Sequence, residues 1–237
     1  MNIFSPLVHN KFAFEKAKKI FKDTSIVDMT DFFNPEFIEQ LTTETLNVFE
    51  QKLQRKDFLM AHTENTPRKM FSVSEKAIYE SSKLIPDFYN NQDLINFLTK
   101  MAQEKVMVLP WTGERYVING LSTSKDTHGW HWDDYSYALV FIAKAPEKHQ
   151  GGAVECIPNT VWNRKNPNIR EILAANEPYK HYFKDGSFYF MKSDTTLHRV
   201  APITEDSLRV AIAMSWCNEK DLAKEIDHKT VYELYGV

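Results

Sequence analysis

The sequence predicts an α+β fold in which helices come first and a β-barrel follows. Apolar residues recur every three or four positions through about the first hundred residues. From residue 106 onward, short β-rich runs alternate with Gly, Pro, Asn and Asp. The 237 residues, 43% of them hydrophobic, can bury one sizeable core. We therefore expect a single domain, mainly helical over 1–105, with a β-barrel core over 106–217 and a C-terminal helical segment over 218–237.

Three apolar stripes define the expected helices, and core packing explains each of them. The second helix should begin at Asn34-Pro35, a capping residue followed by proline at the position where a helix tolerates it. The third should begin after Asn91, which also suits a helix N-terminus. The members of the three stripes are Phe14, Ala17 and Phe21; Ile38, Leu41, Thr45 and Phe49; and Leu94, Phe97, Leu98 and Met101.

The expected strands lie between turn residues. Asp185-Gly186 predicts a hairpin, and Gln150-Gly151-Gly152 predicts another turn, so several strands should pair antiparallel. A last helix-like stretch should pack back on the barrel. Strands are expected over 106–111, 115–118, 130–132, 137–142, 153–157, 188–191 and 208–216, and the last helix over 220–234.

Charge and cysteine content restrict the partners of the protein. The 29 basic residues nearly balance the 32 acidic ones, so nucleic acid and anionic membranes find no excess of positive charge. Cys156 and Cys217 are too few for a disulfide framework and too far apart for a compact zinc site, as expected in the cytoplasm. Residues 1–7 contain no basic segment that leads into an apolar stretch, and no apolar run approaches roughly 18 residues, so we expect neither a leader peptide nor a membrane span. We expect a cytoplasmic protein with a small-molecule partner.

The segment Gly129-Trp-His-Trp-Asp-Asp-Tyr135 contains two candidate metal ligands, His131 and Asp133. In a strand, residues two positions apart point to the same face, so this imidazole and this carboxylate should converge. His198, at the start of another β-like run, offers a second imidazole. Two histidines and one carboxylate leave three positions of an octahedron open for a cosubstrate and dioxygen, which suits iron(II). Zinc would favour four-coordinate closure. We expect these three residues to hold iron and form the catalytic centre.

Arg209 is the candidate for binding the cosubstrate. It stands between the apolar residues Leu208 and Val210, so it should point into the barrel and need an anionic partner. The distal carboxylate of 2-oxoglutarate, whose keto-acid end chelates the metal, suits a guanidinium. Because a His-x-Asp sequence alone occurs by chance in many chains, a metal-free or zinc-bound ligand-binding barrel stays open as an alternative.

Residues 114–216 resemble the small iron and 2-oxoglutarate enzymes that act on free amino acids, namely the radical lysine halogenases and their hydroxylase relatives. The run His128-Gly-Trp-His-Trp-Asp-Asp-Tyr-Ser-Tyr-Ala-Leu-Val-Phe141 carries the resemblance most specifically, and residues 186–202 form a second matching block. The resemblance implies a jelly-roll, that is a cupin-like double-stranded β-helix, with the helical N-terminal third packed on it.

The resemblance also separates two reactions. In the halogenases of this family a glycine replaces the carboxylate ligand and opens a site for chloride, whereas this sequence has Asp133. The resemblance thus implies the hydroxylase branch, with hydroxylation of free L-lysine, C4 favoured, to hydroxylysine, succinate and CO2. Ornithine, arginine or a carrier- or peptide-bound residue are alternative substrates. Proline within a protein partner is disfavoured, because it has no ammonium for acidic residues to engage.

Four residues match substrate positions of that family. Arg68 corresponds to the arginine that holds the substrate carboxylate, and Glu114 and Asp134 correspond to the acidic residues that hold ammonium groups. His128 matches a position near the metal from which it can bond to the substrate without being a fourth ligand. A small charged substrate needs such ion pairs in exchange for its hydration. The alternative interpretation of Glu114 and Asp134 is that both are exposed loop carboxylates.

Overall fold

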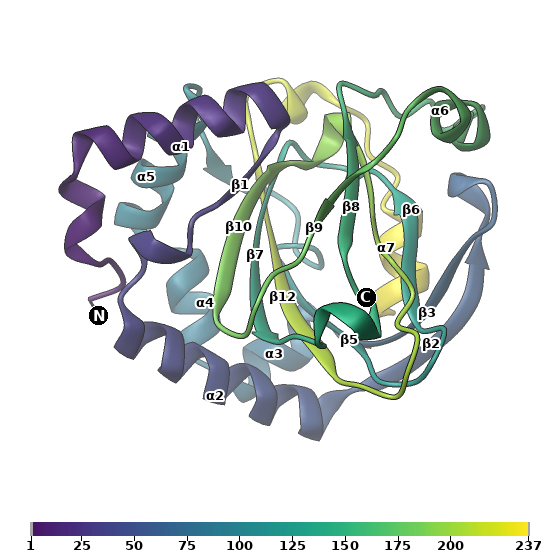
Figure 1. Ribbon diagram of the computed structural model, residues 1–237, viewed down its shortest axis with the longest axis horizontal. Coiled ribbons are helices and arrows are strands. Elements are labelled where there is room, and N and C mark those ends of the chain that lie inside the picture. The colour runs from purple at the N-terminus through teal and green to yellow at the C-terminus, as the bar shows by residue number, and fades with distance from the viewer. Residues whose placement is uncertain (1, 237) are drawn as a thin grey trace.

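A curled antiparallel sheet of twelve strands forms the centre of the computed structural model, which describes residues 2–236 (Figure 1). Its order is β1-β10-β7-β12-β5-β3-β6-β11-β8-β9, with β2 beside β3 and β4 beside β12. Strand β3 pairs with both β5 and β6. It therefore joins a larger half-sheet, β1-β10-β7-β12-β5, to a smaller half-sheet, β6-β11-β8-β9. The strands are β1 Ile26–Asp28, β2 Gln54–Met60, β3 Thr66–Val73, β4 Met107–Val108, β5 Tyr116–Leu121, β6 Thr127–His131, β7 Tyr137–Lys144, β8 Val154–Pro158, β9 Tyr179–His181, β10 Ser187–Lys192, β11 Thr196–Val200 and β12 Arg209–Cys217.

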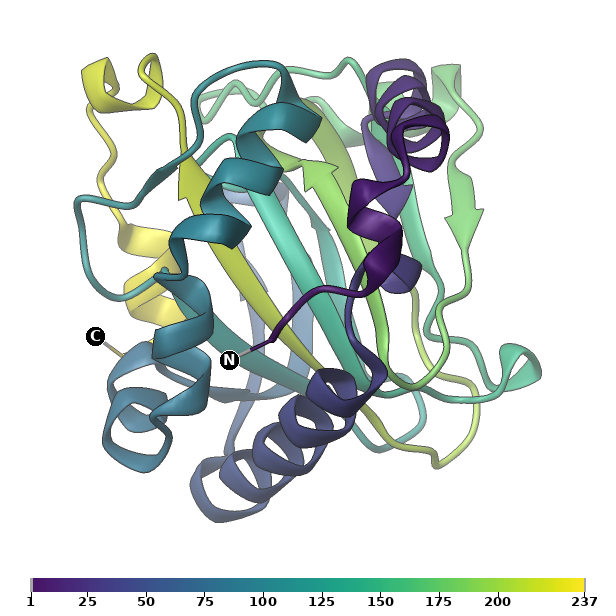
Figure 2. The ribbon, with the colours of Figure 1, turned by 90° about the vertical axis from the view of Figure 1, so that its left-hand side faces the viewer.

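Helices from the first part of the chain cover the outer face of the larger half-sheet (Figure 2). Both predicted helix starts are confirmed: the side chain of Asn34 accepts from the N–H of Glu36, and that of Asn91 accepts from the N–H of Leu94. The α+β fold with helices packed on a barrel-like sheet is therefore confirmed. The helices are α1 Lys11–Thr24, α2 Pro35–Lys52, α3 Glu75–Ser81, α4 Leu84–Tyr89, α5 Gln92–Ala102, α6 Ile169–Ala175 and α7 Lys229–Tyr235. None of those within residues 2–236 has the length and apolar character needed to cross a bilayer.

Strand β12 shows how alternation separates the helix-facing side of the sheet from the inside of the barrel. The side chains buried against the helices are Val210, Ile212, Met214 and Trp216. The side chains that line an internal cavity are Arg209, Ala211, Ala213 and Ser215. Three of these four are small, so the strand leaves space in the cavity, and Arg209 is the long side chain that enters it.

Residues 54–73 differ from the mainly helical structure expected there. They form the hairpin of β2 and β3, with a register that runs from Gln54 opposite Ser72 to Met60 opposite Thr66. The connection between the strands places Glu64 in the left-handed region, without a glycine to mark it in the sequence. The hairpin is fixed by the pairing of β3 with strands more than forty residues downstream, which local periodicity does not report.

The turn predicted at Gln150-Gly151-Gly152 is confirmed, with both glycines at positive φ, and the paired strands are antiparallel as expected. Two other local predictions are wrong in detail. Asp185-Gly186 does not join a hairpin, because β9 pairs with β8 whereas β10 pairs with β1 and β7; the turn carries the chain between the two halves of the sheet. The stretch 220–234 is not one helix: a 3₁₀ turn, Asp221–Ala223, precedes the separate helix α7.

Candidate active site

Three potential metal ligands meet where β6 and β11 run side by side. His131 ends β6 and is the register partner of His198 in β11. Asp133 lies two residues beyond the end of β6 and not within a strand as predicted. Its carboxylate nevertheless faces both histidines. The Oδ1 atom of Asp133 is 3.7 Å from the Nε2 atom of each histidine. The structure thus brings together the three side chains that the sequence predicts to be metal ligands.

The backbone fixes the protonation and orientation of both imidazoles. Nδ1 of His131 lies 2.7 Å from the carbonyl oxygen of Gly129, and Nδ1 of His198 lies 2.8 Å from that of Thr196. A carbonyl only accepts, so each Nδ1 carries a proton, and each Nε2 is the ring nitrogen that faces Asp133. Burial holds the pKa of His131 well below its usual range, which keeps that ring neutral. Two imidazoles whose Nε2 atoms face one carboxylate are a donor set that fits iron(II).

Arg209 is buried in the cavity, at 5% exposure, and lies near Tyr189 of β10. Burial lowers the pKa of the Arg209 guanidinium and raises that of the Tyr189 hydroxyl to about 12, and the two groups stabilise each other's charged forms. Among residues 2–236, no carboxylate pairs with Arg209. A buried guanidinium of this kind requires an anion, and the space left by the small β12 side chains admits one.

Arg68, in β3, is a second buried cation that lines the cavity. Its Nη1 donates to Thr66 Oγ1 at 3.0 Å and to the Pro67 carbonyl at 3.2 Å, whereas its Nε is buried without a partner. Burial lowers the pKa of Arg68 to about 10. It forms no ion pair within the described part of the chain. Arg68 is the register partner of His128, so both enter the same side of the cavity.

His128 lies directly against the metal-site histidines. Its ring stacks on that of His131 with centroids 4.1 Å apart, and its buried Nε2 atom has no partner. Burial, reinforced by the positive charge of Arg68, holds the pKa of His128 well below its usual range. The ring is therefore neutral and leaves a nitrogen available for a ligand in the cavity.

Glu114 and Asp134 line the cavity and are not the exposed loop carboxylates of the alternative interpretation. The side chain of Asp134 is 2% exposed, and Oε2 of Glu114 is buried without a hydrogen-bond partner. Burial, helped by the charge of Asp133, raises the pKa of Glu114 well above its usual range. The two carboxylates also lie close to His228, with one donor atom of each within 4.8 Å of the others.

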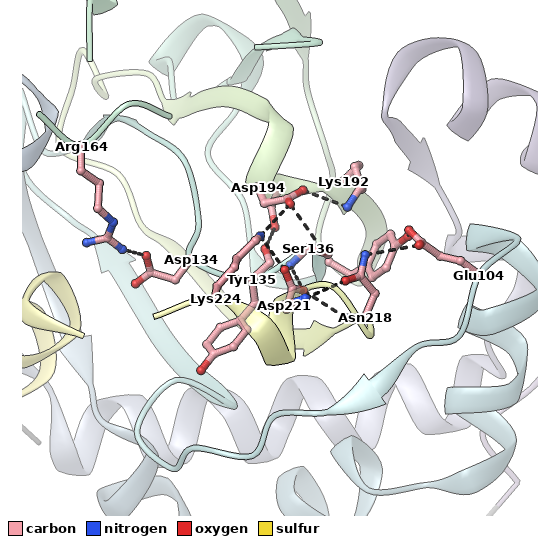
Figure 3. A network of polar contacts seen from close by, with 12 residues as sticks. Glu104, Asp134, Tyr135, Ser136, Arg164, Lys192, Asp194, Asn218, Asp221 and Lys224 are labelled. Carbon is pink, nitrogen blue, oxygen red and sulfur yellow. Dashed lines mark hydrogen bonds and ion pairs between the residues drawn. The ribbon is translucent and has the colours of Figure 1, made fainter. Parts of the chain in front are cut away.

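The loop that carries Asp133 and Asp134 is held by a buried carboxylate, that of Asp221 (Figure 3). Oδ2 of Asp221 accepts from the Ser136 N–H at 3.0 Å, and Oδ1 pairs with Lys224 at 2.5 Å. The Ser136 carbonyl in turn accepts from the Ser193 N–H at 3.0 Å. The loop that carries Asp133 and Asp134 is thereby bonded to Ser193, directly after β10, and to Asp221 in the C-terminal segment.

Sequence reasoning missed several residues of this site. Strand alternation could have identified Tyr189, because it separates the two helix-facing residues Phe188 and Phe190. No sequence signal marks Arg164, which donates to Asp134 (Figure 3), or Tyr235 of α7, which lines the cavity. These two reach the site only through the folding of the last third of the chain.

Several solved structures share the fold of this chain. One is the non-heme alpha ketoglutarate dependent epimerase SnoN from nogalamycin biosynthesis, with 10% identity, TM-score 0.63, and 87% of this chain and 83% of that chain covered. An oxidoreductase of the 2OG-Fe(II) oxygenase family from Burkholderia pseudomallei has 10% identity, TM-score 0.62 and coverage of 86% and 90%. A prolyl hydroxylase from Trichoplax adhaerens has 13% identity, TM-score 0.62 and coverage of 92% and 96%. The expected double-stranded β-helix is confirmed.

The family follows from the sequence over nearly its whole length. No curated protein matches the chain. The family model described as Halogenase D (HalD) matches residues 9–236, which include the helices, the sheet and every candidate site residue. The chain therefore belongs to the Halogenase D family, and it is an enzyme of the iron(II)- and 2-oxoglutarate-dependent oxygenase class.

Proposed function

We propose that this enzyme hydroxylates an unactivated C–H bond of a free basic amino acid, with L-lysine as the favoured substrate and C4 as the favoured carbon. The observation that carries the proposal is the carboxylate of Asp133, 3.7 Å from both histidine Nε2 atoms. In the halogenases that the sequence resembles, a glycine stands at this position. A carboxylate there leaves chloride no vacated position beside the metal.

His131, Asp133 and His198 would hold the iron. Bound iron and 2-oxoglutarate supply the activation of dioxygen and the oxidising power for breaking a C–H bond. The chain would contribute the two Nε2 atoms and the carboxylate oxygen, and this three-ligand set would leave room at the metal for 2-oxoglutarate and dioxygen. The backbone carbonyls of Gly129 and Thr196 keep both rings in place before any metal arrives.

Arg209 and Tyr189 would hold the distal carboxylate of 2-oxoglutarate. Support comes from the burial of the guanidinium, its lack of an ion-pair partner in residues 2–236, and the presence of Tyr189 in the lining of the same cavity. A planar guanidinium engages a carboxylate through two parallel hydrogen bonds, which a lysine could not reproduce. The small side chains of Ala211 and Ala213 lie along the same strand and leave room for the cosubstrate.

Arg68, Glu114, Asp134 and His128 would hold the amino acid. The unpaired guanidinium of Arg68 suits the α-carboxylate, and the buried carboxyl of Glu114 suits an ammonium, whose positive charge would favour the ionised carboxylate. Asp134 offers a second carboxylate for a side-chain ammonium. The free Nε2 of His128 can hydrogen-bond the substrate close to the metal. Apolar residues cover the alkyl chain and exclude water; these are Met60, Met70, Trp132 and Leu234.

Anaerobic titration of the protein with iron(II) and 2-oxoglutarate tests the metal and cosubstrate assignment, because chelation of the keto acid produces a visible charge-transfer band. Oxygen is then admitted with lysine, ornithine, arginine or a lysine-containing peptide, and products are identified by mass and NMR. Succinate formation with one oxygen added to lysine supports the proposal. No band and no added oxygen would contradict it and favour a ligand-binding barrel without this chemistry.

The description of the family favours halogenation as a second candidate. The same assay separates the two reactions when it is run with and without chloride. Lysine that gains chlorine in place of hydrogen would support halogenation and would show that Asp133 does not occupy the position where chloride binds. Hydroxylated lysine at both chloride concentrations supports the first proposal.

A further inference from the structure

Arg164 joins three segments at the edge of the substrate cavity. It lies in the loop between β8 and α6, and its guanidinium donates to the carboxylate of Asp134 in the loop after β6 (Figure 3). Its Nη1 also donates at 3.0 Å to Oδ1 of Asp227, which precedes α7. The guanidinium stacks on the ring of Trp162 at 4.0 Å. Asp134 lines the cavity, and Arg164 reaches it from the loop outside.

The charged groups of the substrate cavity are consequently not equivalent. Asp134 is already paired with a cation, Arg164, although its side chain is only 2% exposed. Glu114 has a buried oxygen without a partner, and Arg68 has no carboxylate partner within residues 2–236. Apart from Arg209, which we assign to 2-oxoglutarate, and Asp133, which we assign to the metal, the cavity lining has one cation without a carboxylate partner, Arg68, one unpaired acid, Glu114, and one acid already paired, Asp134.

This arrangement bears on the charge of the substrate side chain. The α-carboxylate and α-ammonium of any free amino acid can be matched by Arg68 and Glu114. A second ammonium, such as that of lysine, needs a second carboxylate in a place with little water, and Asp134 is the nearby candidate. An ammonium and a guanidinium that approach the same carboxylate repel each other, most strongly where the surroundings are poorly hydrated.

We propose that Arg164 is a specificity-determining residue that competes with the side-chain ammonium of the substrate for Asp134. The inference rests on the proposed function only in taking a free amino acid as the ligand. Asp227 provides the place to which Arg164 can withdraw, because it already holds Nη1 and its side chain is 40% exposed. The balance between the two carboxylates sets how strongly the pocket prefers an amino acid with a cationic side chain over one with an uncharged side chain.

Removal of Arg164 should favour the cationic ligand. Without it, Asp134 becomes a buried carboxylate with no cation, a costly state that a ligand ammonium relieves. Norleucine, which has the alkyl chain of lysine without the ammonium, gains nothing from the change. Arg164→Gln should therefore raise the ratio of lysine affinity to norleucine affinity by about tenfold or more.

Calorimetric titration of lysine and norleucine into the anaerobic iron(II) and 2-oxoglutarate complex measures this ratio without turnover. Lys165→Gln is the matched control, because it removes an exposed positive charge from the same loop without a contact to Asp134. Its ratio should equal that of the wild type. An unchanged ratio in Arg164→Gln, or an equal rise in Lys165→Gln, would overturn the proposal.

Two further variants test the pairing itself. Asp227→Asn removes the place of withdrawal, so Arg164 should stay on Asp134 and the lysine to norleucine ratio should fall, opposite to the effect of Arg164→Gln. In an Asp134→Asn background, Arg164→Gln should no longer change the ratio. A shift of the same sign in Asp227→Asn and Arg164→Gln, or an undiminished shift in the Asp134→Asn background, counts against competition.

The outcome for Arg164 is distinguishable from that for the proposed function. A protein that shows the expected affinity ratios but adds oxygen to no amino acid contradicts the proposed hydroxylation and leaves the role of Arg164 intact. A protein that hydroxylates lysine, but whose lysine to norleucine affinity ratio is the same with and without Arg164, supports the proposed function and contradicts the role of Arg164.

Discussion

His131 and His198 face each other as register partners across β6 and β11, and each donates its Nδ1 hydrogen to the carbonyl two residues earlier in its own strand. The same local bond is thus made twice, once on each strand. Because the strands fix both carbonyls, the two Nε2 atoms are held in place by the sheet itself.

His198→Gln should lower iron(II) affinity by more than about 100-fold, because loss of a direct ligand costs more than the 10- to 100-fold typical of an outer partner. The fold should persist, since β11 pairs with β8 through its backbone. Anaerobic metal titration and circular dichroism measure the two effects. His181→Gln, in β9, is the control and should bind iron normally. Equal iron affinity in both variants would contradict the ligand assignment.

Asp133→Gly should abolish most hydroxylation and weaken metal binding, because the third ligand is lost. Any iron that remains bound should become sensitive to chloride, which can enter the vacated position. Product analysis by mass with and without chloride, together with metal titration, measures this outcome. Asp133→Ala serves as the comparison that removes the carboxylate without the flexibility of glycine. Undiminished hydroxylation in either variant would show that another residue supplies the carboxylate.

Arg209→Met should raise the KM for 2-oxoglutarate by about 100-fold, since truncation of one partner of a buried charge pair costs about 2–5 kcal/mol. Arg209→Lys should recover part of this loss, because it restores the charge but not the two parallel hydrogen bonds. Steady-state kinetics with varied 2-oxoglutarate measures both. Arg199→Gln, in β11 and paired with Glu155, should leave this KM unchanged. If Arg209→Met leaves it unchanged too, the cosubstrate binds elsewhere.

Glu114→Gln should stabilise the ligand-free protein at neutral pH by about 1–3 kcal/mol, because the wild type buries a carboxyl oxygen without a partner. Since burial raises the folded-state pKa of Glu114, its contribution to stability is complete below the unfolded pKa near 4.5 and is lost as pH rises through the folded pKa. The variant should lack this decline. Urea denaturation across pH measures it, with the exposed Glu39→Gln as control.

The same Glu114→Gln change should weaken lysine binding, because the neutral amide forms no ion pair with an ammonium. Higher stability together with lower affinity is the combined signature expected of a substrate-binding carboxyl. A variant that is less stable than the wild type would instead indicate that Glu114 has a structural role.

Asp221→Asn should reduce the free energy of unfolding by about 1–3 kcal/mol, because the amide loses the charge-assisted hydrogen bonds that the buried carboxylate accepts. Its side chain is fully buried between Lys224 and the Ser136 N–H. Metal affinity should fall as well, because the ligand loop loses its anchor. Asp57→Asn, an exposed partner of Arg55, should cost less than about 1 kcal/mol in the same urea titrations. Equal costs for the two variants would contradict this account.

The sequence predicts those parts of the molecule whose cause is local. Asn34 and Asn91 mark helix starts because a cap needs only its own next three residues. The apolar neighbours of Arg209 predict its inward direction for the same reason. The hairpin that carries Arg68 could not be predicted, because β3 is held by strands far along the chain. The role of Arg164 could not be predicted either, because its partner Asp134 lies in another loop, 30 residues earlier in the sequence.

The position of Asp133 just past the end of β6 has a consequence for how this family can diversify. Asp133 lies outside β6, and its side chain is not part of the hydrophobic core. Loss of this side chain should therefore cost the sheet little stability. On the proposed assignment of Asp133 as the ligand that selects the reaction, mutation can alter the chemistry while the fold keeps its stability. Natural selection can explore one reaction or another here without first having to rebuild the protein.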